Sequence, residues 1–220
     1  MSTDTGAGVA PSDDAPQVSP RRERTRERLL DAAFEVFSRV GVQGSSIETI
    51  CDAAGFTRGA FYSNFASKEE LLVALVTRDM RARLASLEGV VEELDVTAVE
   101  GSTVRPEVVR TVFAAVMGDP DDQRRFHLVQ TEFELMALRD PEIGQRYQAQ
   151  QEQIRGELLE AMRRVFATLG LRFVIPDREA VDILVATYLF SAQQAFFVRG
   201  EDPRATALLE PVVRLLATEA

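Results

Sequence analysis

The chain has 220 residues, of which 45% are hydrophobic and 27% charged, so it can fold into one or two domains with a sizeable core. A net charge of −10 argues against a non-specific DNA-binding protein, and a single histidine and a single cysteine exclude the common zinc sites and a disulfide framework. No apolar run approaches the roughly 18 residues of a membrane-spanning helix, and the N-terminus lacks the basic and apolar parts of a signal peptide. We therefore expect a cytoplasmic protein with no metal, no other cofactor and no membrane partner.

The N-terminal end contains a polar tail followed by an amphipathic helix. Residues 1–19 are rich in Pro, Ser, Asp and Gly and are expected to be disordered. Residues 24–40 show helical periodicity, with an apolar stripe formed by Leu29, Leu30, Ala33, Phe34, Phe37 and Val40. Cations crowd the start of this helix, where the helix dipole disfavours them; they are Arg21, Arg22, Arg24, Arg26 and Arg28. They form either an arm that contacts an external polyanion or a solvated, frayed helix start.

The segment that follows, GVQGSSIETICDAAGFTRGAFYSNFASKEE, predicts two short helices joined by a tight turn. Ser45 and Ser46 can cap the first helix, and Glu48 stands three residues after Ser45, as a capping box requires. Gly55 can adopt the positive φ that ends this helix. Such a pair of helices forms a helix-turn-helix, in which the second helix enters the major groove of DNA. The preceding amphipathic helix packs behind them and completes a three-helix core.

The second short helix has an apolar and a polar side. Phe61 and Phe65 face the core together with Ala60, whereas the outward residues are Arg58, Gly59, Tyr62, Ser63 and Asn64. A second capping box, from Ser67 to Glu70, opens a longer helix. The polar side is therefore the expected contact surface for DNA.

Residues 24–75 resemble the TetR family of bacterial transcriptional regulators. The amphipathic first helix, SSIETICDAAGFTRGAFYSNF and SKEELL follow the family's pattern, and the shared positions include Gly55, Gly59, Tyr62, Phe65 and Lys68. The resemblance implies a homodimer that places the second short helix of each subunit in the major groove of a palindromic operator. It also implies a repressor that a small-molecule effector releases from this operator, with an activator or dual regulator as the alternative.

The resemblance further implies which side chains contact DNA. Arg58, Gly59 and Ala60 match the base-facing positions, where Arg58 can pair with guanine O6 and N7. The residues that match phosphate-contacting positions are Ser46, Thr57, Tyr62, Asn64 and Lys68. Asn64 stands where many members have histidine, so the contact loses its pH sensitivity. From the residues alone, each of these side chains can instead be an ordinary surface or packing side chain.

The remainder of the chain is expected to be helical. The expected helices span residues 106–117, 121–139, 141–169, 177–199 and 203–218, and no strand is expected. The fold class is therefore all-α, with an N-terminal three-helix helix-turn-helix DNA-binding domain and a C-terminal helical ligand-binding and dimerisation domain. The expected boundaries are a disordered tail of residues 1–19, a DNA-binding domain of residues 20–68 and an effector-binding and dimerisation domain of residues 69–220.

The last two expected helices carry more apolar surface than one buried face requires, which indicates a partner. We expect the homodimer contact to be formed by Val181, Leu184, Tyr188, Ala192, Leu208, Val212 and Leu216. A large monomeric core would have a similar sequence, so this alternative stays open.

The middle helices interleave large apolar residues with polar ones, which is typical of small-molecule pockets. The expected pocket for an unidentified, largely apolar effector consists of Phe113, Met117, Phe126, Gln130, Phe133, Tyr147, Phe190 and Gln194. Residues of this kind at helical spacing also form ordinary cores, and the sequence does not separate the two.

The distribution of charge agrees with an N-terminal DNA-binding domain. Residues 1–83 carry 11 Lys and Arg against 12 Asp and Glu, whereas residues 84–220 carry 14 against 23. The acidic residues are thus concentrated away from the expected DNA surface. An enzyme is the competing class, but the sequence has no GxSxG, no phosphate-binding glycine loop and no Glu-x-x-His pair, so no catalytic residue is expected.

Overall fold

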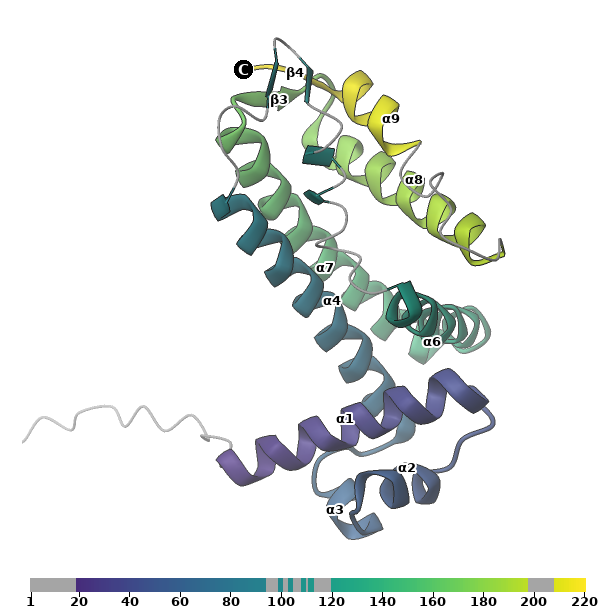
Figure 1. Ribbon diagram of the computed structural model, residues 1–220. Coiled ribbons are helices and arrows are strands. Elements are labelled where there is room, and N and C mark those ends of the chain that lie inside the picture. The colour runs from purple at the N-terminus through teal and green to yellow at the C-terminus, as the bar shows by residue number, and fades with distance from the viewer. Residues whose placement is uncertain are drawn as a thin grey trace, which may run out of the picture.

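The computed structural model describes residues 19–93, 99–100, 103–104, 108–109, 111–112, 120–197 and 208–220. Its helices in these ranges are α1 (Pro20–Val40), α2 (Ile47–Ala54), α3 (Arg58–Tyr62), α4 (Lys68–Glu93), α6 (Pro120–Arg139), α7 (Pro141–Thr168), α8 (Asp177–Phe197) and α9 (Leu209–Leu216) (Figure 1). The predicted all-α class is confirmed. The predicted tail lies outside the described residues except for Ser19, and the helix expected over residues 106–117 lies largely outside them.

The first helix begins earlier than the sequence analysis placed it. The Ser19 hydroxyl accepts a hydrogen bond from the Arg22 N–H at 3.3 Å, and Pro20 occupies the first helical position, where its fixed φ suits a helix. The cap therefore moves the start of α1 to Pro20. The positively charged segment is a regular, capped helix from that residue onward.

Four short strands correct the expectation that the chain has none. β1 (Val99–Glu100) pairs with β2 (Thr103–Val104), and β3 (Leu171–Phe173) pairs antiparallel with β4 (Ala217–Glu219), with Arg172 opposite Thr218. Gly170 ends α7 with a φ of 65°, and Leu171 and Phe173 then point into the core. The last helix thus ends at Leu216 rather than at residue 218. Segments of two or three residues are too short for a period-2 pattern to be seen in a sequence.

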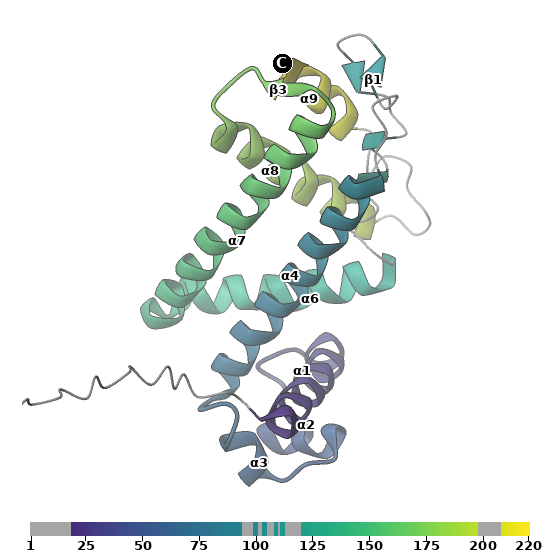
Figure 2. The ribbon, with the colours of Figure 1, turned by 90° about the vertical axis from the view of Figure 1, so that its left-hand side faces the viewer.

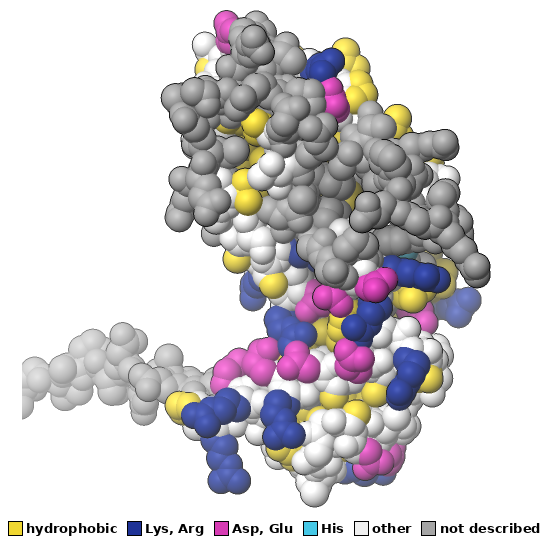
Figure 3. Space-filling model, in the orientation of Figure 1, with side chains coloured by type: hydrophobic (Ala, Val, Ile, Leu, Met, Phe, Trp, Pro, Cys, Tyr) yellow, Lys and Arg dark blue, Asp and Glu magenta, His cyan; other side chains and the backbone are white. Residues whose placement is uncertain are grey.

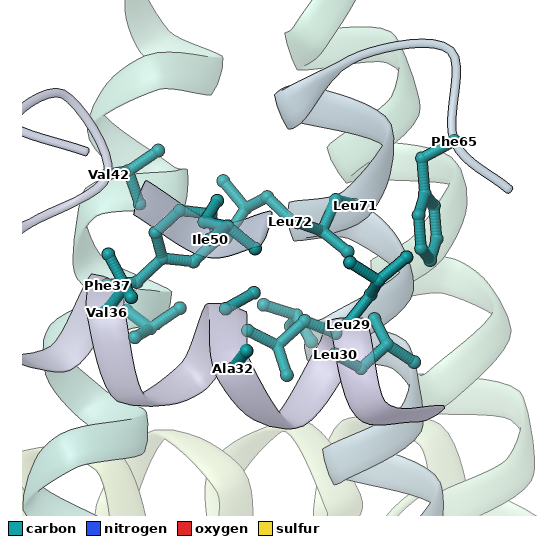
Figure 4. Packing of buried hydrophobic residues seen from close by; sticks show 14 of the residues in the cluster. Leu29, Leu30, Ala32, Val36, Phe37, Val42, Ile50, Phe65, Leu71 and Leu72 are labelled. Carbon is teal, nitrogen blue, oxygen red and sulfur yellow. The ribbon is translucent and has the colours of Figure 1, made fainter. Parts of the chain in front are cut away.

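The N-terminal helices share one core. Helices α1, α2 and α3 and the first turns of α4 bury a set of large apolar side chains that includes Leu29, Phe37, Ile50, Phe65 and Leu71 (Figure 4). The apolar stripe predicted for the first helix is buried, except that Phe34 is half-buried and Val40 is exposed. Removal of these groups from water is the main term that stabilises α2 and α3, since helices of eight and five residues are marginal in isolation.

This N-terminal core extends into the rest of the chain. Val129, Phe133 and Met136 of α6 are buried in the same cluster, and Tyr147 of α7 packs its ring against Phe133 at a centroid distance of 5.1 Å. Helix α6 therefore lies directly on α1. The helix-turn-helix unit is not an independent body on a tether.

A second core lies at the opposite end of the molecule. It joins the end of α4 to α7, α8, α9 and the β3–β4 pair, with Leu87, Phe166, Val181 and Leu216 among its buried residues. Helix α4 has 26 residues and reaches from the first core to the second, packed along α7 (Figures 1 and 2). Helix α7 contacts the first core through Tyr147 and the second through Phe166, so two long helices link the cores.

We predict that Phe133→Ala lowers the free energy of unfolding by about 3–5 kcal/mol, because it opens a cavity where α6 meets the N-terminal core. Urea denaturation measures the effect. Leu138→Ala on the same helix is the matched control, because Leu138 is 84% exposed, and it should change stability by at most about 0.5 kcal/mol. Equal losses in the two variants would contradict the placement of Phe133 in the shared core.

Candidate nucleic-acid interface

Local hydrogen bonds explain why the α2–α3 segment folds as it does. The Ser46 hydroxyl accepts from the Thr49 N–H at 3.1 Å and caps α2, and the Thr57 hydroxyl accepts from the Ala60 N–H at 3.3 Å and caps α3. Between them, Gly55 adopts a left-handed φ of 69° that turns the chain. The capping box predicted from Ser45 to Glu48 is wrong, because Ser46 is the cap.

The displaced residues have other roles. Ser45 is buried, and its hydroxyl donates to the Val42 carbonyl at 2.7 Å, which stabilises the loop before α2. Glu48 does not complete a capping box with Ser45; its carboxylate is hydrogen-bonded to the backbone at the start of α2 and pairs with another side chain, as described below.

Helix α3 has the two sides that the sequence predicted. Phe61 and Phe65 are buried, whereas Arg58, Gly59 and Tyr62 are exposed and Ala60 is half-buried. The phenylalanine rings lie 5.9 Å apart and anchor the helix against α1. The anchor leaves a short, rigid, polar ridge whose N-terminal residues point into solvent, which is the presentation that major-groove reading requires.

The Arg58 guanidinium is held in place by two neighbours. Its Nη1 pairs with the Glu48 carboxylate, and its Nη2 donates to the Tyr62 hydroxyl at 3.4 Å. Hydrogen bonding to the backbone at the start of α2 and the charge of Arg58 lower the pKa of Glu48, so this carboxyl stays ionised at neutral pH. The side chains of Arg58 and Glu48 are 58% and 52% exposed, so the pair is open to DNA. Sequence reasoning missed Glu48, which it had explained as a capping residue.

Lys68 connects α4 to the loop that precedes α2. Its Nζ donates to the Val42 carbonyl at 2.7 Å and to the Ser45 carbonyl at 2.9 Å. From the other side, Glu132 of α6 accepts a hydrogen bond from the Val42 N–H. We refer to these three hydrogen bonds as the loop clamp. The phosphate contact predicted for Lys68 stays a prediction, because an ammonium group has one donor beyond those that the loop uses.

Asn64 makes a local contact. Its Nδ2 donates to the Ala60 carbonyl at 2.8 Å, so the amide is turned back along α3. The backbone carbonyl of Asn64 accepts a hydrogen bond from the Arg26 guanidinium at 3.3 Å. The same guanidinium lies 4.4 Å from the Phe65 ring centroid. Arg28 donates to the Ala54 carbonyl at 2.7 Å and caps the C-terminal end of α2. Two of the five N-terminal arginines thus support the helix-turn-helix from behind.

Four of the eight predicted DNA-contacting residues line a shallow hollow of about 350 Å³, whereas Thr57, Gly59, Ala60 and Asn64 do not. Ser46, Glu48, Arg58, Tyr62 and Lys68 all line it. In the space-filling view, Lys and Arg side chains gather at the N-terminal end of the molecule, with Asp and Glu side chains between them (Figure 3). The structure therefore brings α2, α3 and the start of α4 together on one surface.

A partly open apolar cavity lies in the second core, far from this surface. Its volume is about 150 Å³, and its walls come from α4, α7, α8, α9 and residues 108–112. The lining residues are Leu87, Val108, Val109, Val112, Leu158, Met162, Val165, Phe166, Leu169, Val181, Leu184, Val185, Tyr188, Leu209 and Val213. The Tyr188 hydroxyl is the polar side-chain group among these residues.

The predicted pocket residues that the structure describes do not line this cavity. Phe126, Phe133 and Tyr147 belong to the first core, and Phe190 and Gln194 are exposed on α8, whereas Phe113 and Met117 lie outside the described residues. The rings fill the junction of α6 with the N-terminal helices, and the cavity is instead lined by aliphatic residues that resemble ordinary core in a sequence.

A small polar cluster lies between α6 and α7. Gln130 Nε2 and the Tyr147 hydroxyl both donate to the Glu134 carboxylate, at 3.1 and 3.2 Å, and burial near this charge raises the pKa of Tyr147 to about 12. Gln150 is buried, and neither its amide nitrogen nor its amide oxygen has a hydrogen-bond partner among the described residues.

The predicted dimer residues mostly face inward. Val181, Ala192 and Leu216 are buried, and Leu184 and Tyr188 line the cavity, whereas Val212 is half-buried and Leu208 is exposed. The exposed apolar residues of the same two helices are Ile183, Leu189, Phe190, Leu208 and Leu215. The apolar surface predicted on α8 and α9 is present, but of the seven predicted residues only Leu208 is exposed on it.

Cys51 is buried on the inner face of α2, and burial raises the pKa of its thiol, as expected for a small apolar side chain. Burial lowers the pKa of His127 on α6. Among the described residues, no group of three or more His, Cys, Asp and Glu residues is placed to hold a metal ion. No helix in the described part of the chain is long and apolar enough to cross a membrane.

Comparison with known proteins places this geometry in context. A sequence model of bacterial regulatory proteins of the tetR family matches residues 29–75. Over 190 residues the chain is 30% identical to the HTH-type transcriptional regulator UidR of Escherichia coli (strain K12), covering 80% of this chain and 88% of UidR.

Solved structures share the whole fold. GusR of Salmonella enterica has a TM-score of 0.63 at 23% identity, covering 92% of this chain and 99% of GusR. SmeT, the repressor of the Stenotrophomonas maltophilia multidrug efflux pump SmeDEF, has a TM-score of 0.57 at 25% identity, covering 92% of each chain.

We predict that Lys68→Met weakens binding to all DNA sequences about equally, because it removes one phosphate-neutralising charge. The slope of log K against log salt concentration should fall by about one. The variant should also be less stable by about 1–3 kcal/mol, since two loop carbonyls lose a charged donor. Fluorescence anisotropy over a salt series measures the slope; an unchanged slope would show that Lys68 acts only through the loop clamp.

Proposed function

The chain belongs to the TetR family of bacterial transcriptional regulators, and we propose that it is a repressor which a small, largely apolar molecule releases from a palindromic operator. The observation that carries the DNA-binding part is the polar ridge of α3, anchored by Phe61 and Phe65 and flanked by the capped starts of α2 and α4. Arg58 is the proposed base-reading residue. Ser46, Thr57, Tyr62 and Lys68 are the proposed phosphate contacts around it. A bacterial transcriptional regulator acts on the chromosome, which lies in the cytoplasm. This supports the expected cytoplasmic location.

A homodimer is proposed to read two half-sites at once. The exposed apolar residues of α8 and α9 form a surface whose contact with water is unfavourable. Leu215, for example, is 75% exposed. A two-fold contact between copies would cover it on both subunits. One five-residue helix contacts few base pairs, so pairing two of them about one helical turn apart is what makes a specific operator feasible.

The apolar cavity supports the class of effector. A site of about 150 Å³ with aliphatic walls fits a small uncharged molecule and excludes an isolated charge, because burial of an unpaired ion is costly. The unpaired amide of Gln150 lies on α7, outside the cavity lining, and is a neutral hydrogen-bonding group. SmeT, which shares the fold, is the repressor of a multidrug efflux pump, and this supports a repressor.

Helix α4 is the proposed connection between the cavity and DNA. Leu87 near its end lines the cavity, and Lys68 at its start holds the loop before α2. A ligand that displaces Leu87 would shift the whole helix and thereby the two α3 helices of the dimer. A coupling free energy of about 1–3 kcal/mol would weaken operator binding by about 5- to 150-fold.

We predict that selection from genomic DNA fragments at about 150 mM salt yields a palindromic consensus. In Arg58→Ala, the preference for guanine at one position of each half-site should disappear, at a cost of about 1–3 kcal/mol on the consensus site. Sequencing of the bound fragments and anisotropy titrations measure both. A uniform loss of affinity for every sequence would contradict a base-reading role for Arg58.

We also predict that toluene raises the melting temperature of the protein, whereas benzoate at pH 8 does not, because the cavity accepts an apolar ring and not a carboxylate. Val185→Phe fills part of the cavity and should abolish the response to toluene. Gln193→Ala, an exposed change on the same helix and outside the proposed dimer surface, serves as the control. Stabilisation by benzoate equal to that by toluene would exclude the apolar cavity as the binding site.

A further inference from the structure

We propose that Glu48 is a specificity-determining residue, which orients Arg58 and selects cytosine beside the guanine that Arg58 reads. This inference rests on the proposed function, since it assumes that α3 enters the major groove. It starts from the ion pair between the two side chains, which joins the first turn of α2 to the first residue of α3. A single contact therefore links the two helices of the DNA-binding surface across their turn.

Glu48 is an acidic residue on the surface that is proposed to contact DNA. It lines the same hollow as Ser46, Arg58, Tyr62 and Lys68, so a carboxylate stands inside the ring of proposed phosphate contacts. Next to phosphate this charge is repelled at every DNA sequence. Glu48 contributes to sequence selectivity when the correct DNA sequence offers its carboxylate a hydrogen-bond donor that offsets this repulsion.

The geometry of Arg58 leaves it able to bind guanine while it is paired. Glu48 uses Nη1 and Tyr62 contacts Nη2, and the guanidinium lies 5.8 Å from the Tyr62 ring centroid. A guanidinium has more N–H donors than these two contacts use, so enough remain for a bidentate bond to guanine O6 and N7. Glu48 and Tyr62 restrict the rotation of the planar group, and less conformational freedom is lost when the base is bound.

The same geometry places the carboxylate at a base edge. Because Glu48 is in direct contact with Arg58, its carboxylate lies within one base step of the guanine when Arg58 binds it. A carboxylate only accepts hydrogen bonds, and the major groove offers amino donors at N4 of cytosine and at N6 of adenine. Adenine places its N7 acceptor beside the amino group, so the carboxylate pairs best with cytosine. Thymine O4 and guanine O6 present acceptors and repel it. The pair thus reads a guanine and a neighbouring cytosine.

The test compares the wild type with Glu48→Gln and with Asp52→Asn, in selections from randomised duplexes followed by titrations on single-base variants of the consensus. Asp52 is the matched control, because it is an exposed carboxylate one turn further along α2. Melting curves confirm that all three proteins are folded. Both variants should bind non-specific DNA more tightly, since each loses one negative charge.

The expected result separates the two carboxylates. Glu48→Gln should lose about fivefold or more of the preference for cytosine next to the Arg58-dependent guanine, whereas Asp52→Asn should keep it. An unchanged consensus in Glu48→Gln, with both variants tightened by the same factor, would overturn the inference and leave the DNA-binding function intact. Absence of any enriched motif with the wild type would instead overturn the proposed function, and the inference with it.

Discussion

The loop clamp is the constraint on which the rest of the structure depends. The loop between α1 and α2 has no regular structure, yet α6 holds it through Glu132 and α4 holds it through Lys68. Gly41 makes the close approach possible: its φ is 79°, and a Cβ at this position would lie 2.6 Å from the Glu132 carboxylate. Three helices that are far apart in the sequence thus meet at one turn of backbone, directly beside the DNA-facing surface.

Charged contacts reinforce this junction from the sides. Arg78 of α4 pairs with Glu27 and Asp31 of α1 at 3.0 and 2.8 Å, and with its neighbour Asp79. Burial raises the pKa of Asp79, against the opposing effect of Arg78. On the other side, the Arg125 guanidinium of α6 lies 4.6 Å from the Phe34 ring centroid and pairs with Glu35. Because α4 and α6 each form ion pairs with α1, we expect a movement of either helix to move the helix-turn-helix with it.

Features with local signals could be predicted from the sequence. The glycine turn at Gly55, the Thr57 cap and the buried faces of Phe61 and Phe65 each depend on residues within one or two turns. The partner of Glu132 is 90 positions away in the sequence, so no spacing rule could reveal it. The exposed side of α8 could not be identified for a similar reason: both sides of this helix are apolar, and only the packing shows that Val181 faces inward and Ile183 outward.

The apolar cavity shows another limit of a single sequence. Large rings and polar neighbours indicated a pocket near Phe133, but these rings fill their own junction, whereas the empty space lies among valines and leucines. Empty volume depends on how well side chains of several helices fit together, and composition does not report that fit. The interpretation of Glu48 failed through an ambiguity of another kind, since one carboxylate near a helix start satisfies both a cap and a cross-helix ion pair.

The position of Lys68 has a consequence for protein chemistry. It is the only lysine in the chain, so its side chain carries the only primary amine apart from the amino terminus. Apart from the amino terminus, an amine-selective reagent can therefore attach a fluorophore only at Lys68, where α4 meets the loop before α2. Acylation there would remove the positive charge and two hydrogen-bond donors in one covalent step, and the accessibility of this amine would report directly whether the loop is held.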